Sequence, residues 1–312
     1  MAKKHKNSLR LDADFTEDTV GLALESFLTL LSFPRSRFSI EPFSKRRERF
    51  LGADARLNGS LKKFKPFYMQ FKRPSAWPDV SRAGIITDRK ALGLPVDPRS
   101  LFFNLRNKRD SHFDYQHNIL FRLRERLHKK NLGDAAYVCP LFLDRSAYRF
   151  HIHMAGLRGW FFVLRHFPWE FEDILINSSS GSINFNAIPV LREHVSIPPH
   201  TKVSTASHSY SFTEQGTDLC FHSPMALPQV TISLADFLNR LIGRLESDEG
   251  YVSVEEAHLM LRRCFGQNEN GDGSLLPFDI QDEQGIESWL YWGDYLKTEY
   301  QIEQFALMHW VD

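Results

Sequence analysis

The sequence predicts an α/β core followed by an α+β domain, with the boundary near residue 145. In residues 1–145, runs with helical spacing alternate with short β-prone runs. In residues 146–312, β-prone aromatic runs come first and helical runs follow Pro228. The charge also changes sign, because residues 1–130 carry 28 Lys and Arg against 14 Asp and Glu, whereas the remainder carries 11 against 24.

The core is expected to begin with a helix and three strands. Thr16 or Asp14 as the cap, acids in the first turn and apolar residues at helical spacing predict a helix that stops before Pro34. Residues 37–43 alternate like a strand. Gly52–Leu57 and Pro66–Arg73 are β-prone runs joined by a turn-prone segment, and we expect them to form a β-hairpin.

A helix and a strand complete the predicted core. Residues 74–111 contain prolines and little periodicity, which predicts an irregular excursion with short elements beside the substrate cleft. Gln116–Lys130 combines an apolar stripe with a basic face, which is typical of an amphipathic helix. Ala135–Phe142 has the character of a buried strand. The predicted order is therefore helix, three strands, helix and strand.

The second half is expected to form an antiparallel sheet followed by helices. Tyr148–Met154 is one of several aromatic, β-prone runs separated by turn signals. Ser233 and Ser253 are suited to cap two helices. An acidic, aromatic helix is expected from Gly293 to Trp310.

Polar residues of the predicted hairpin can meet at one place. Asp54 is on its first strand, and Gln70 and Lys72 are two residues apart on the second, so they share a face of the sheet. Oxygen ligands for a divalent cation beside an ammonium are suited to metal-assisted phosphodiester hydrolysis. Glu25 lies near the apolar stripe of the first helix, where a carboxylate is either partnered, functional or at a solvent-exposed boundary.

These motifs resemble those of the PD-(D/E)XK phosphodiesterase superfamily, the restriction-endonuclease-like fold, in its Gln-x-Lys variant. Gly52-Ala53-Asp54 matches the family's Gly-x-Asp strand, Gln70-Phe71-Lys72 matches the strand that follows, and Glu25 matches the glutamate of the preceding helix. The resemblance covers roughly residues 14–142. It implies a mixed sheet flanked by helices and the activity of a metal-dependent endonuclease.

The resemblance also implies a role for each residue. Asp54 and Gln70 would bind Mg²⁺ or Mn²⁺, and Glu25, or alternatively Glu48, would complete the metal site. Lys72 would orient or help to deprotonate the attacking water and offset charge on the phosphate. Many relatives have an acid where this chain has Gln70, and an amide is a weaker ligand for a hard cation than a carboxylate.

The basic first half predicts a polyanionic partner, which we expect to be nucleic acid and more specifically DNA. Its phosphates are expected to contact Arg46, Arg47, Lys62, Lys63, Lys65, Arg73, Arg122 and Arg126. By analogy with Gln-x-Lys nucleases, a role in bacterial defence against foreign DNA is expected. Two alternatives stay open: a non-catalytic nucleic-acid-binding subunit that keeps a nuclease-like fold, and a protein-interaction subunit that forms a homodimer or binds a partner through its acidic half.

Other classes of protein are disfavoured by the sequence. No apolar run approaches the roughly 20 residues of a membrane span, and no apolar core follows the basic N-terminus, so we expect a cytoplasmic protein without a membrane partner. Cys139, Cys220 and Cys264 are too scattered for a disulfide framework. The histidines of the second half and the EF-hand-like segment Asn268–Asp279 match no complete metal-ligand pattern.

Overall fold

The computed structural model describes residues 9–31, 38–42, 63–155, 176–177, 182–183, 185, 189–222, 225–226, 232–242, 250–265 and 285–309. Five residues with a predicted role lie outside these ranges, namely Arg46, Arg47, Glu48, Asp54 and Lys62. The predicted strand Gly52–Leu57 and the segment Asn268–Asp279 also lie outside them.

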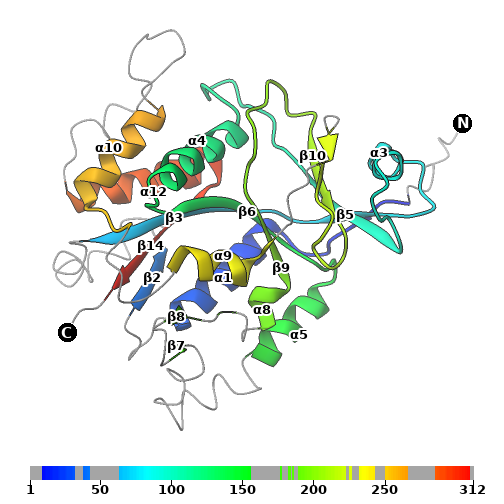
Figure 1. Ribbon diagram of the computed structural model, residues 1–312, viewed down its shortest axis with the longest axis horizontal. Coiled ribbons are helices and arrows are strands. Elements are labelled where there is room, and N and C mark those ends of the chain that lie inside the picture. The colour runs from blue at the N-terminus through cyan, green and yellow to red at the C-terminus, as the bar shows by residue number, and fades with distance from the viewer. Residues whose placement is uncertain are drawn as a thin grey trace, which may run out of the picture.

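A six-stranded mixed sheet forms the centre of the fold (Figure 1). Its parallel pair consists of β3 (Phe64–Phe71) and β6 (Asp134–Pro140). The order across the sheet is β13 (Ile232–Ser233), β9 (His194–Ile197), β6, β3, β14 (Glu303–His309) and β2 (Phe38–Pro42). The predicted α/β class is confirmed by this sheet and by the helices that flank it.

Helices cover both faces of the central sheet. In Figure 1, α4 (Gln116–Lys129), α10 (Val254–Phe265) and α12 (Ile286–Tyr300) lie on one face, and α1 (Glu17–Leu31) and α9 (Leu234–Ile242) lie on the other. Among the described helices, none combines the length and apolar character that a membrane crossing requires.

Side chains of β3 identify the two faces. The ring of Tyr68 lies 6.4 Å from the ring of Trp289 in α12, measured between centroids. Phe71 instead lies against Gly21 of α1, so closely that a Cβ on Gly21 would be 3.0 Å from the Phe71 ring. Because neighbouring strand residues point to opposite faces, even-numbered residues of β3 face α4 and α12, and odd-numbered residues face α1.

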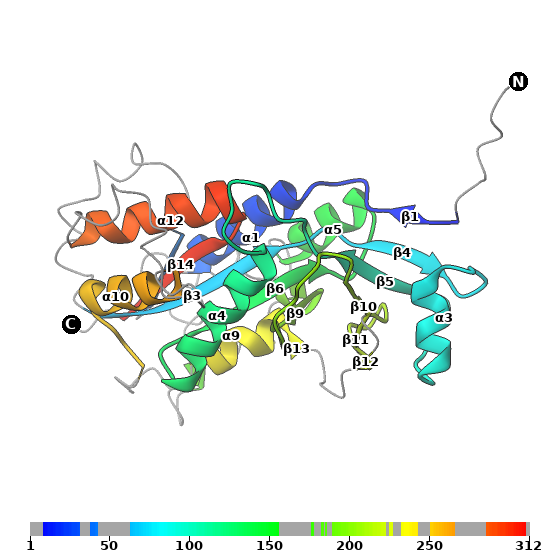
Figure 2. The same ribbon diagram turned by 90° about the horizontal axis from the view of Figure 1, so that it is seen from above.

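A second six-stranded sheet extends toward one end of the molecule (Figure 2). Its order is β1 (Leu11–Asp12), β4 (Ser75–Pro78), β5 (Arg99–Asn104), β10 (Ser209–Phe212), β11 (Cys220–Phe221) and β12 (Met225–Ala226), with antiparallel pairing throughout. α3 (Gly84–Ala91) separates β4 from β5 in the sequence. The excursion at residues 74–111 thus contains two strands and a helix, in agreement with the prediction of short elements.

The remaining short elements flank these sheets. β7 (Ile176–Asn177) and β8 (Ser182–Ile183) form a two-stranded sheet. α5 (Arg145–Ala155) and α8 (Pro189–Arg192) lie on the α1 side of the central sheet in Figure 1.

The predicted helix starts are confirmed by their capping bonds. The hydroxyl oxygens of Thr16 and Ser233 accept the backbone N–H three residues further on, at 3.2 Å and 3.0 Å. Ser253 and Glu256 form a reciprocal capping box, with donor–acceptor distances of 3.2 Å and 2.8 Å. Each cap satisfies backbone donors that the first helical turn leaves without partners.

Two predicted elements of the second half are wrong. Tyr148–Met154 lies in the helix α5 instead of a strand, and the Tyr148 ring packs 5.5 Å from Phe15 and 5.1 Å from Phe142. The helix expected from Gly293 to Trp310 ends at Tyr300, and β14 follows it. Gln301 separates the two elements in a left-handed conformation with φ of 52°, which terminates the helix.

The predicted hairpin is wrong where it can be checked. Phe67–Met69 pairs with β6 along one edge and with β14 along the other, so that β3 has no open edge there for a hairpin partner. The second strand of the predicted hairpin exists, but it ends at Phe71 and not at Arg73.

The predicted domains share both sheets. In the central sheet, β14 and β9 come from the second half and pair with β3 and β6 from the first half. In the other sheet, β10 from the second half pairs with β5 from the first. Residues 1–145 and 146–312 therefore do not form separate sheets.

We predict that Phe305→Ala in β14 will lower the free energy of unfolding by about 3–5 kcal/mol. Phe305 stacks on Phe67 with a centroid distance of 4.9 Å, and both rings are fully buried. Equilibrium unfolding in urea measures the change. The control is Leu22→Ala, at a side chain that is 60% exposed on α1, for which we expect less than about 0.5 kcal/mol. Equal changes in the two variants would contradict the central position of β14.

Candidate functional site

Lys72 follows the last residue of β3 at the carboxyl end of the parallel strand pair. Its backbone N–H donates to the carbonyl of Val138 at 2.8 Å, which continues the pairing with β6. The side chain is only 4% exposed. Its Nζ donates to Oε1 of Gln116, the first residue of α4, at 3.5 Å, and lies 5.7 Å from the ring centroid of Tyr137. The ammonium is thus enclosed between two strand ends and the start of a helix.

Gln70 points to the same face as Lys72 and is 1% exposed. Its partner across the parallel strands is Tyr137. Within the described part of the chain, neither polar atom of the Gln70 carboxamide has a hydrogen-bond partner. A buried polar group in this condition costs about 1–3 kcal/mol. A water molecule, an anion or a metal ion bound beside Gln70 would remove that cost.

Glu25 lies on the opposite face of the sheet from Gln70 and Lys72. Glu25 is one helical turn beyond Gly21, whose backbone lies against Phe71, and the two positions share a side of α1. The Glu25 side chain is 6% exposed. The structure thus brings Gln70 and Lys72 together as predicted, but it does not bring Glu25 to them.

Burial lowers the pKa of Lys72 from its ordinary value of 10.5. The negative charge of Glu17 at the start of α1 acts in the opposite direction, and the positive charge of Arg106 adds to the lowering. Because the neutral amine is favoured by burial, Lys72 releases its proton more readily than a surface lysine. Glu17 is therefore an α1 carboxylate whose charge acts on Lys72.

His117 adjoins this centre and has a defined tautomer. Its Nε2 lies 2.7 Å from the carbonyl oxygen of Thr201, and its Nδ1 lies 2.7 Å from the hydroxyl of Tyr137. A carbonyl oxygen only accepts, so Nε2 carries the proton and Nδ1 accepts the hydrogen of Tyr137. Burial lowers the pKa of His117 to about 4, which keeps the imidazole neutral near pH 7.

Four residues of this centre were not identified from the sequence, namely Glu17, Gln116, His117 and Tyr137. Glu17 was not identified because an acidic residue is common in the first turn of a helix, where it stabilises the helix without any further role. A signal does precede the apolar stripe of α4, where Gln116, His117 and Asn118 are consecutive polar residues, and all three are buried. Asn118 accepts the N–H of Val203 at 2.8 Å and donates to its carbonyl at 2.9 Å, so this turn also fixes a distant segment.

The basic residues predicted to contact nucleic acid have different environments. Lys65 is buried and donates to a backbone carbonyl of α9 at 3.0 Å, so it is enclosed by protein instead of facing a ligand. Arg122 forms an ion pair with Asp114. Lys63 and Arg73 are exposed, and Arg126 lines a pocket between α4 and α10.

Metal-ligating side chains are sparse in the part of the chain that the structure describes. No three His, Cys, Asp or Glu side chains there are grouped so that they could hold a metal ion. The three cysteines are buried free thiols, as expected. His222 hydrogen-bonds to Ser211 at 2.8 Å and to Asp88 at 3.0 Å, which explains its position without a metal.

We predict that acidification from pH 6.5 to about 4 will destabilise the protein through His117. Its folded-state pKa of about 4 lies below the ordinary 6.5, so the unfolded state binds more protons between these values and stability falls as the pH falls. The full effect is roughly 3 kcal/mol. Urea unfolding at several pH values measures it, and His117→Gln is expected to reduce the slope in this window. An unchanged slope would contradict a buried neutral His117.

Comparison with known proteins leaves this centre to be interpreted from its own geometry. The chain matches no protein-family model, no curated protein and no solved structure.

Proposed function

We propose that this protein is a metal-dependent phosphodiesterase that cuts nucleic acid, most specifically a DNA endonuclease. The observation that carries the proposal is the burial of both Gln70 and Lys72 at the carboxyl end of β3. In the sequence, α4 lies between β3 and its parallel neighbour β6. An amide without a partner beside a lysine with a lowered pKa is a chemically unusual pair for a core. Buried, perturbed groups of this kind concentrate at functional sites.

The donor groups of Gln70 suit a divalent cation only if carboxylates join them. The Oε1 atom of Gln70 would be one oxygen ligand for Mg²⁺ or Mn²⁺. Asp54 and Glu48 would supply the carboxylates, because Glu25 lies on the other face of the sheet. A bound metal ion supplies polarisation of the phosphate and a more acidic water.

Lys72 would act on the proton and on the phosphate charge. When neutral, its amine accepts a proton from water, and burial favours that neutral form. When protonated, its ammonium offsets the charge that develops on the phosphate oxygens. The Gln116 amide oxygen, 3.5 Å away, would hold Nζ in position for both roles.

A non-catalytic nucleic-acid-binding subunit is the second candidate, and the burial of the pair favours it. Gln70 and Lys72 are 1% and 4% exposed, so a phosphate reaches them only if neighbouring groups move. A subunit of this kind would bind nucleic acid with a steep dependence on salt and would cut nothing. The role in bacterial defence against foreign DNA belongs to the nuclease proposal and is not required by this second candidate.

We predict that the protein will cleave plasmid DNA in Mg²⁺ or Mn²⁺, and that Lys72→Met and Asp54→Ala will each lower the rate by at least about 100-fold. The reason is that the first variant removes the proton acceptor and the second removes a metal ligand. Agarose gel electrophoresis of the products measures the rate, and circular dichroism confirms folding.

Lys90→Met serves as the matched control for Lys72→Met. Lys90 is exposed on α3, where its ammonium donates to the carbonyl of Asp79 at 2.8 Å, and we expect its rate to equal that of the unmodified protein. Equal activity in Lys72→Met and Lys90→Met would refute the assignment of the site. Salt-sensitive binding without cleavage would instead favour the second candidate.

A further inference from the structure

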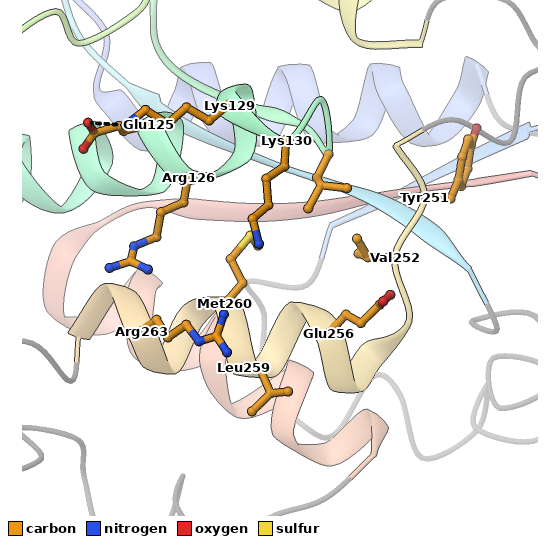
Figure 3. A pocket seen from close by; sticks show the side chains of 11 residues that line it. Glu125, Arg126, Lys129, Lys130, Tyr251, Val252, Glu256, Leu259, Met260 and Arg263 are labelled. Carbon is orange, nitrogen blue, oxygen red and sulfur yellow. Dashed lines mark hydrogen bonds and ion pairs between the residues drawn. The ribbon is translucent and has the colours of Figure 1, made fainter.

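A pocket of about 480 Å³ opens between the end of α4 and α10 (Figure 3). Both helices lie on one face of the central sheet (Figure 1), and Lys72 contacts the first residue of α4 on that face. Ligand pockets in proteins commonly have volumes of roughly 300–1,000 Å³. The pocket therefore has the size of a small-molecule or mononucleotide site and lies on the same side of the sheet as the candidate centre.

The wall of the pocket carries an excess of positive charge. It contains four cationic and two anionic side chains, namely Arg126, Lys129, Lys130, Arg263, Glu125 and Glu256. Glu125 is paired with Lys129 at 3.3 Å, and Glu256 accepts the backbone N–H of Ser253 at 2.8 Å. In Figure 3, Arg126 and Lys130 extend from α4 toward α10. Guanidinium and ammonium groups so placed favour a phosphate or carboxylate ligand.

The rest of the wall is apolar. It is formed by the aromatic ring of Tyr251 and by the aliphatic side chains Leu132, Val252, Leu259 and Met260. Leu259 is 49% exposed, although most large apolar side chains of the described residues are buried. An exposed leucine beside arginines suits a ligand that has both an apolar body and an anionic group. A nucleotide has this chemistry, since its base offers an apolar face and its phosphate is anionic.

The pocket and Lys72 are joined by one rigid element. Gln116, which contacts Lys72, begins α4, and Arg126 is ten residues further along the same helix. At about 1.5 Å per residue, this places Arg126 roughly 15 Å from Gln116 along the helix axis. A base-stacked nucleic-acid strand advances about 3.4 Å per nucleotide, so a strand that stays stacked as far as the pocket covers this distance in roughly four or five nucleotides.

We propose that this pocket holds one nucleotide of the bound strand, four or five positions from the phosphate at Lys72, with Arg126, Lys130 and Arg263 contacting its phosphate. The inference rests on the proposed function, because the strand must also reach Lys72. In this proposal, α4 fixes the distance between the cutting site and the second binding site. The strand would be single where its base enters the pocket, because a base packs against the apolar wall only when it is unpaired.

The test is fluorescence anisotropy with a fluorescein-labelled single-stranded dodecathymidylate, using the full chain in EDTA so that no cutting occurs. Arg126→Gln/Arg263→Gln is expected to weaken binding about 10- to 100-fold. Each lost phosphate contact should also reduce the slope of log K against log salt by about 0.7. Met260→Glu, which places a carboxylate on the apolar wall, is expected to weaken binding as well.

The control carries the same charge change on the opposite face of the sheet. Arg149→Gln/Arg192→Gln changes exposed arginines on α5 and α8, and we expect it to bind like the unmodified protein. Equal losses in the pocket and control variants would overturn the inference. Equal competition by inorganic phosphate, at the same phosphate concentration as the oligonucleotide, would also overturn it by showing a simple anion site.

The cleavage assay separates this inference from the nuclease proposal. If the unmodified protein binds the oligonucleotide through the pocket but cuts no DNA, the nucleotide site stands and the nuclease proposal fails. If the unmodified protein cuts DNA and Arg126→Gln/Arg263→Gln binds and cuts equally well, the nuclease proposal stands and the nucleotide site fails.

Discussion

The pairing of β14 with β3 is the interaction on which the rest of the structure depends. Six residue pairs, from Glu303 opposite Met69 to Met308 opposite Phe64, join the last described strand to the centre of the sheet. β2 then attaches to the other edge of β14, and the rings of Phe67 and Phe305 stack across the pair. The central sheet is therefore complete only when the two ends of the sequence meet, which makes folding depend on contacts of large sequence separation.

This closed arrangement also determines what the candidate centre can be. With β6 on one edge of β3 and β14 on the other, the side chains of β3 are available only above and below the sheet. Gln70 and Lys72 point to the α4 side, at the place where strand pairing ends and the first turn of α4 begins. Functional groups often lie beyond the carboxyl ends of parallel strands, because the strands position side chains there without covering them. Here Gln116 and Tyr137 enclose the lysine further.

Structural features that depend on neighbouring residues, such as helix caps, were predicted from the sequence, whereas features that depend on distant residues, such as strand pairing, were missed. The caps at Thr16 and Ser253 and the amphipathic helix α4 follow from short-range chemistry, and the structure confirms them. β14 was predicted as part of a helix because no proline interrupts the acidic, aromatic residues that lead into it. Gln301, whose left-handed conformation ends α12 before β14, has no strong sequence signal. The shared face of Gln70 and Lys72 was predictable from their spacing, whereas the position of Glu25 depended on which face α1 covers.

The polar character of the core around β3 is the strongest physical reason to expect a function there. Gln70 leaves two buried polar atoms without partners in the described structure, and Lys72 keeps a cationic group where burial disfavours the charge. Each condition opposes folding, and apolar residues of similar size would relieve both at little cost. Tyr137 and His117 illustrate the contrast, because the same core satisfies their polar atoms with each other and with Thr201. A core that satisfies the polar atoms of His117 and Tyr137 but leaves those of Gln70 without partners has the composition of a site that a ligand completes.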